Sequence, residues 1–157
     1  MKLKNFFKLM GALVVCQLAG VVGSVFTVSQ IPTWYQTLNK PALNPPAWVF
    51  GPVWAALYLL MGVALYLVWE SHSKDKKKAL WLFAIQLALN AIWSPVFFGA
   101  HSIGNALAII ILMWVAIVMT IFVFSKVSKP AAALLVPYIL WVSFATYLNF
   151  ALWWLNK

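Results

Sequence analysis

Aromatic rings and uncharged amides are the groups in this chain whose types and spacing could do chemistry. In three apolar stretches they recur every three or four residues, a spacing that places them on one face of a helix. These sets are Trp54, Tyr58 and Met61; Gln86, Asn90 and Trp93; and Trp141, Ala145 and Leu148 or Asn149. Indole and phenol rings stack well on flat apolar molecules. Three such faces could line one cavity for a flat, apolar ligand.

Helix packing is the alternative explanation for each of these residues taken alone. Amides form hydrogen bonds between membrane helices, and Trp or Tyr near helix ends belongs to interfacial belts. For Gln86 and Asn90, interhelical bonding and ligand contact stay open as alternatives. Trp54 and Trp141 favour the cavity, because they lie well inside apolar stretches where each indole N–H needs an acceptor. A ligand carbonyl or a neighbouring amide could supply it.

Few residues are available for acid–base or metal chemistry. The two carboxylates, Glu70 and Asp75, lie in one charged segment beside His72. His101 is distant in the sequence, so the chain has no metal-ligand spacing. No acidic or basic residue lies in the middle of a long apolar stretch, which argues against ion-coupled pumping. The sequence therefore predicts no metal site and no required cofactor.

The composition of the chain indicates a membrane protein. Of its 157 residues, 65% are apolar and 8% charged, and the mean hydropathy is +0.93. Soluble domains are roughly half apolar and about one quarter charged. Long apolar runs predict helices near 6–28, 47–69, 79–99, 103–125 and 130–154. We expect a single all-α transmembrane domain, 1–157, built as a five-helix up-down bundle.

The connection at 29–46 is the only long one, and it is rich in proline. It contains Lys40-Pro41 and Asn44-Pro45-Pro46. Proline lacks a backbone N–H and restricts the residue before it, so a continuous helix is excluded here. The sequence predicts an extended, Pro-rich capping loop between the first two spans.

The lysines predict which way the chain crosses the membrane. All eleven cationic residues are lysines, and the net charge is +9. One side of the predicted bundle carries nine of them: Lys2, Lys4, Lys8, Lys74, Lys76, Lys77, Lys78, Lys126 and Lys129. Since cytoplasmic loops are enriched in lysine, we expect the N-terminus in the cytoplasm and the C-terminus outside, taking the membrane to be a bacterial-type cell membrane. This topology explains the positive charge better than a nucleic-acid partner does, and the partner expected is membrane lipid.

Three motifs make this chain resemble the translocator protein (tryptophan-rich sensory protein) family. They run in order along most of the sequence. They are Trp34-Tyr35 with Asn44-Pro45-Pro46-Ala47-Trp48 and Trp54; Gln86-Leu87-Ala88-Leu89-Asn90 with Trp93-Ser94-Pro95; and Pro137-Tyr138 with Trp141 and Phe144-Ala145-Thr146. The resemblance implies a five-helix bundle whose cavity is capped by the first loop, and it implies a homodimer.

The resemblance also implies a ligand class and a set of contacts. Members of this family bind porphyrins such as protoporphyrin IX and haem, and isoquinoline-carboxamide and benzodiazepine-type drugs. By position in the motifs, the implied ligand-binding residues are Tyr35, Pro45, Trp48, Trp54, Tyr58, Asn90, Trp93, Trp141, Ala145 and Leu148. Lys40 would lie near the outer rim, where it could pair with the carboxylates of a porphyrin.

Cholesterol, which some family members bind, is not expected as the natural ligand. The motif proposed for it requires Leu or Val, then Tyr, then Lys or Arg within short spacings. In this chain Phe150 stands where the tyrosine would be, and Trp154 stands where the arginine would be.

Three functions compete for such a protein. The leading one is a porphyrin-binding receptor or sensor, with passive transport of the ligand left open. The second, also suggested by the family, is an enzyme that degrades porphyrin with light and oxygen, with Trp54 and Trp141 as its reacting residues. A driven transporter ranks last, because the sequence has no inverted repeat and no site for a coupling ion.

Overall fold

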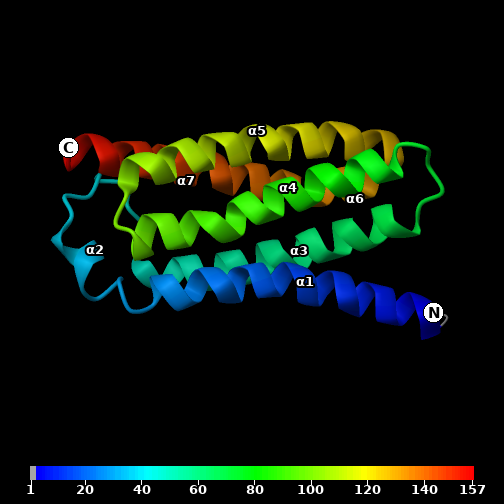
Figure 1. The fold of residues 1–157 in the computed structure, drawn as a ribbon, viewed down its shortest axis with the longest axis horizontal. Helices are drawn as coiled ribbons and strands as arrows, with labels where there is room; N and C mark the ends of the chain where they lie inside the picture. Colours follow the sequence, from blue (N-terminus) through cyan, green and yellow to red (C-terminus); the bar gives the residue numbers. More distant parts are fainter. Residues whose placement is uncertain (1–2) are drawn as a thin grey trace.

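The computed structural model describes residues 3–157, so Lys2 lies outside the described part. Over that range the chain forms helices and no strands. The helices long and apolar enough to span a membrane cover Leu3–Thr27, Ala47–Glu70, Lys76–Gly99, Ile103–Val127 and Lys129–Leu155. They run side by side along the long axis of the molecule (Figure 1). The predicted five-helix fold is therefore confirmed.

Several spans are divided into shorter elements. In chain order these are α1 (Leu3–Thr27), α2 (Trp34–Thr37), the 3₁₀ turn η1 (Ala47–Val49), α3 (Phe50–Glu70), α4 (Lys76–Ser94), the π turn η2 (Pro95–Gly99), α5 (Ile103–Val127), α6 (Lys129–Leu134) and α7 (Val136–Leu155). The third span begins three residues before the predicted 79–99, because lysine is a good helix former that a search for apolar runs overlooks.

Proline accounts for the irregularities in the third and fifth spans. Pro137 has no N–H to continue the helix, and the last span is split at Leu135 into α6 and α7 instead of forming one helix over 130–154. Pro95 begins the π turn, which is closed by the N–H of Ala100 bonding to the carbonyl of Pro95 at 2.9 Å. Wider turns of this kind re-aim the side chains that they carry.

The helices form a closed ring in which α1 packs on α3 and α4, α4 on α5, and α5 on α6 and α7. Two glycines allow the close approach of α1 and α3. A Cβ on Gly20 would lie 2.5 Å from Cε2 of Tyr58, and one on Gly62 would lie 2.9 Å from Cα of Leu13. The ring is less tight between α3 and α7, since α3 packs mainly on α6.

The two ends of the bundle differ in character. The N-terminal end, the α3–α4 loop and the α5–α6 turn lie together, whereas α2 and the C-terminus lie at the opposite end (Figure 1). At the first end Lys8 forms a salt bridge with Glu70, which ties α1 to α3. Between the ends, large apolar side chains such as Val14, Leu112 and Phe122 are exposed on the outer surface. Such a surface suits contact with lipid.

Candidate ligand-binding cavity

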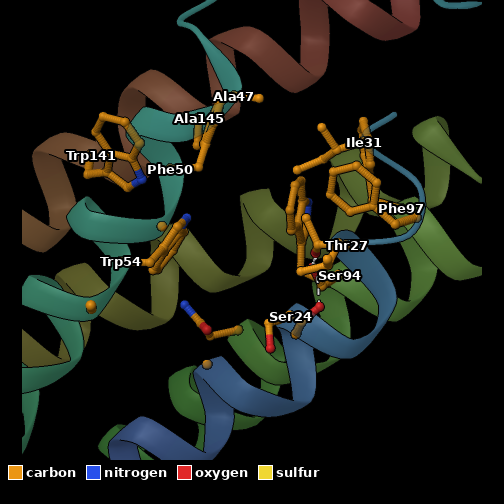
Figure 2. Close-up of a pocket in the computed structure, with 18 of the residues that line it drawn as sticks. Ser24, Thr27, Ile31, Ala47, Phe50, Trp54, Ser94, Phe97, Trp141 and Ala145 are labelled. Atoms are coloured by element: carbon orange, nitrogen blue, oxygen red, sulfur yellow. Dashed lines mark hydrogen bonds between the residues drawn. The ribbon is translucent and has the colours of Figure 1, made fainter. Parts of the chain in front are cut away.

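A cavity of about 500 Å³ opens between α1, α3, α4, α5 and α7 at the end that carries α2. Pockets for small molecules measure roughly 300–1,000 Å³. Figure 2 shows one wall formed by Trp141, Phe50 and Trp54, and a facing wall formed by Thr27, Ser94 and Phe97. The lining is mostly apolar, with a small number of hydroxyl and amide groups. This arrangement suits an apolar ligand that has a few polar atoms.

The structure brings nine of the ten sequence-predicted site residues to this cavity. They are Tyr35, Trp48, Trp54, Tyr58, Asn90, Trp93, Trp141, Ala145 and Leu148. Pro45 is absent from the lining. Its neighbour Asn44 is also outside the lining, but it accepts a hydrogen bond from the hydroxyl of the lining residue Tyr35 at 2.8 Å.

Trp141 carries the one indole N–H of the cavity wall that is both buried and without an acceptor among the described residues. Its ring meets Phe50 edge-on, with centroids 5.9 Å apart. Trp54 stands nearby and stacks on Tyr58, with centroids 5.5 Å apart and an angle of 28° between the planes. A buried donor without a partner is costly in a low-dielectric interior. The cavity wall therefore contains an unsatisfied donor, which a ligand acceptor would reach only after the side chains that cover it move.

Four buried polar side chains form a chain of hydrogen bonds below the cavity. The hydroxyl of Tyr58 donates to Oδ1 of Asn90 at 2.5 Å, and Nδ2 of Asn90 donates to the hydroxyl of Tyr138 at 3.1 Å. Tyr138 in turn donates to Oε1 of Gln86 at 2.8 Å. For Gln86, interhelical bonding is the outcome, whereas Asn90 both bonds between helices and lines the cavity. These hydrogen bonds fix the position of Tyr58 at the cavity floor.

The π turn and the end of α4 supply the aromatic wall below the lid. Trp93 stacks on Phe97, with centroids 5.0 Å apart and an angle of 24°. Its N–H donates to Oδ1 of Asn149 at 3.0 Å, and Asn149 donates to the carbonyl of Ile103 at 3.0 Å. Unlike Trp141, Trp93 is thus held by the protein and keeps no polar group free for a ligand.

Residues 28–46, called the lid below, close the cavity from outside. The prediction of an extended loop is only partly right, since the lid contains the one-turn helix α2. Trp34 stacks on His101 with centroids 4.2 Å apart. Tyr35 is buried, and this burial raises the pKa of its phenol above the ordinary value. The ammonium of Lys40 lies 4.9 Å from the centre of the Tyr35 ring and bonds to lid carbonyls, and Lys40 is not part of the cavity lining.

Comparison with known proteins shows sequence relatives that cover most of this chain. The sequence model of the TspO/MBR family matches residues 12–155. A tryptophan-rich protein TspO of Chlorobaculum tepidum is 48% identical over 90% of each chain. The human translocator protein is 43% identical, covering 92% of this chain and 87% of the relative. A tryptophan-rich sensory protein of Cereibacter sphaeroides is 42% identical over 78% of this chain and 77% of its own. The chain belongs to the TspO/MBR family.

Membership and the five spans together make this TspO/MBR protein a multi-pass integral membrane protein. Its cavity has hydroxyl and amide groups but, within residues 3–157, no Asp, Glu, His, Lys or Arg in the lining. No group of three His, Cys, Asp or Glu residues lies close enough to hold a metal ion in that same range. The residues that line the site can stack, make apolar contacts and form hydrogen bonds.

Sequence reasoning missed the α1 wall of the TspO/MBR cavity. Ser24 and Thr27 line it, and the hydroxyl of Thr27 is 2.7 Å from that of Ser94 (Figure 2). A close pair of small residues, Gly20 and Ser24, was the available signal, because such spacing marks a face where helices approach. On this face of α1, Gly20 lies against Tyr58 of α3, and Ser24, one turn later, lines the cavity.

Proposed function

We propose that this protein is a membrane receptor or sensor that binds porphyrins, such as protoporphyrin IX and haem, and similar flat apolar ligands. The observation that carries the proposal is the buried, unpartnered indole N–H of Trp141 in a cavity walled by aromatic rings. Membership of a family with sensory and translocator proteins supports a receptor role. Homology and cavity chemistry thus favour the same class of function.

Apolar contact would supply most of the affinity. A flat ring system could stack beside Trp54. Each Å² of its apolar area that leaves water for the cavity would contribute roughly 25 cal/mol of binding free energy, before the costs of association. A carbonyl or carboxylate on the ligand would accept from Trp141 once the side chains that cover its N–H move. Pairing of a porphyrin acid with Lys40 would require that side chain to leave the carbonyls of Gln36 and Leu38.

A dark titration with protoporphyrin IX tests this proposal. The wild type and a Trp54→Phe/Trp141→Phe variant are compared by following the absorbance of the porphyrin, which does not depend on the number of tryptophans. The matched control is Trp69→Phe/Trp81→Phe, since both of these rings are exposed and outside the cavity lining. We expect saturable binding in the wild type and the control, and weaker binding in the cavity variant. Equal binding in all three would contradict the cavity as the site.

An enzyme that degrades porphyrin with light and dioxygen is the alternative function. The observation that favours it is that two oxidisable rings, Trp54 and Trp141, both line the cavity that would hold the photosensitiser. In such a reaction the porphyrin is oxidised and dioxygen is reduced. A defined product formed only in light, whose yield collapses when either tryptophan is replaced by phenylalanine, would support catalysis. A mixture of products unaffected by the substitutions would indicate simple photodamage.

A further inference from the structure

We infer that Asn156, at the end of α7, is the latch that holds the lid closed and so sets the rate of ligand exchange. The identity of the exchanging ligand rests on the proposed function, whereas the latch itself does not. Asn156 touches the lid at Asn39, a residue 117 positions away in the sequence. Neither residue lines the cavity.

The side-chain amide of Asn156 bonds to both the backbone N–H and the backbone carbonyl of Asn39. The backbone N–H of Asn39 donates to Oδ1 of Asn156 at 2.9 Å, and Nδ2 of Asn156 donates to the carbonyl of Asn39 at 2.9 Å. Nδ2 of Asn156 also donates to the carbonyl of Leu152 at 2.8 Å, which fixes the side chain on its own helix. The Asn39 side chain reaches the carbonyl of Leu155 at 3.4 Å. Both groups of the Asn156 amide are thus engaged with the lid.

The lid is held unevenly along its length. Near α2 it is anchored by packing: Trp34 lies on Phe97 and His101, and Tyr35 is almost fully buried. Where the chain leads into α3, Leu43 is 66% exposed and Trp48 is 74% exposed. The Asn39–Asn156 pair lies between these parts; Asn39 is exposed, Asn156 is half-buried, and the hydrogen bond between them is exposed. A contact made of exposed hydrogen bonds, with little apolar burial, is the part of the lid that opens most readily.

Such a contact should affect the rates of ligand association and dissociation more than the affinity for the ligand. It stabilises the closed lid whether or not the cavity is filled, because it touches no lining residue. Its loss would make opening more frequent and speed association and dissociation by the same factor. Net contributions of single hydrogen bonds predict an effect of roughly three- to ten-fold. The equilibrium dissociation constant should stay the same while the lid remains mostly closed.

The first test needs no ligand. A cysteine is placed in the cavity by Ala145→Cys, in a Cys16→Ala background, and its reaction with a membrane-impermeant thiol reagent is timed in nanodiscs. Asn156→Ala should accelerate labelling roughly three- to ten-fold. Asn105→Ala is the matched control, because Asn105 is exposed and bonds to Ser102 on its own helix start. An unchanged labelling rate in Asn156→Ala would overturn the latch.

The second test follows protoporphyrin IX in the dark by stopped flow, using the same Asn156→Ala and Asn105→Ala substitutions in the natural background. The latch predicts faster association and faster dissociation in Asn156→Ala with an unchanged dissociation constant. A weaker affinity with unchanged labelling would show that Asn156 shapes the cavity, and faster labelling with unchanged exchange rates would show that the ligand passes between helices; either result overturns the proposal. If no variant binds the porphyrin, the labelling rates still decide the latch, and only the proposed ligand fails.

Discussion

The hydroxyl of Tyr58 on α3 and the side-chain oxygen of Asn90 on α4 lie 2.5 Å apart at the floor of the cavity. Both residues are buried and both line the cavity. Their hydrogen bond is the first of the chain that continues through Tyr138 to Gln86. Because this chain crosses from α3 through α4 to α7, it couples the shape of the binding site to the stability of the bundle.

Removal of the central hydroxyl should destabilise the protein more than removal of the terminal one. Tyr138→Phe leaves both Nδ2 of Asn90 and Oε1 of Gln86 without a partner, whereas Tyr58→Phe leaves only Oδ1 of Asn90. Side-chain hydrogen bonds between membrane helices average about 0.6 kcal/mol, with a maximum near 1.7. We expect a larger decrease in the thermal unfolding midpoint for Tyr138→Phe. Tyr147→Phe, at an exposed position, is the control and should show no decrease.

A methyl group at Gly20 should damage both stability and binding. The added Cβ would lie 2.5 Å from the Tyr58 ring, which is buried and bonded to Asn90, so the ring could move only by straining this bond or by entering the cavity. Overpacking of this kind costs roughly 1–3 kcal/mol. Gly11→Ala on the same helix meets nothing within 4 Å and should be neutral or stabilising. Thermal unfolding and dark porphyrin titration of both variants check this; equal behaviour would show that α1 and α3 can separate at no cost.

The sequence predicts the parts of the site that depend on residue spacing within one helix, and it does not predict those that depend on contacts between distant segments. Trp54 and Trp141 follow from helical spacing in apolar stretches, and both line the cavity. Thr27 was missed because α1 has no aromatic face. The Thr27 hydroxyl also bonds to the carbonyl of Gly23, as threonine commonly does inside a helix, so nothing in the sequence marks it as a cavity residue. The pairing of Asn39 with Asn156 joins residues 117 apart and leaves no periodic signal. Topology therefore followed from composition, whereas polar contacts between distant segments required the structure.

Orientation in the membrane is a separate prediction. The described lysines other than Lys40 and Lys157 belong to the end that carries the N-terminal part of α1 and the α3–α4 loop. We propose that this end faces the cytoplasm. In intact cells and a Cys16→Ala background, Leu43→Cys in the lid should react with a membrane-impermeant maleimide, and Lys74→Cys should react only after lysis. The reverse pattern would invert the assignment and place the lid inside the cell.

Trp141 should select ligands that carry a hydrogen-bond acceptor. Its buried N–H has no acceptor among the described residues, so a bound carbonyl would satisfy it, and Trp141→Phe would remove that bond while keeping an aromatic ring. The affinity of an isoquinoline carboxamide should fall roughly two- to ten-fold in the variant, as expected for one hydrogen bond. The analogue in which CH₂ replaces the carbonyl should lose much less. Dissociation constants for the two ligands and two proteins form a double-mutant cycle. A coupling energy of zero would mean that the Trp141 N–H does not bind the ligand carbonyl and that Trp141 contributes only its ring.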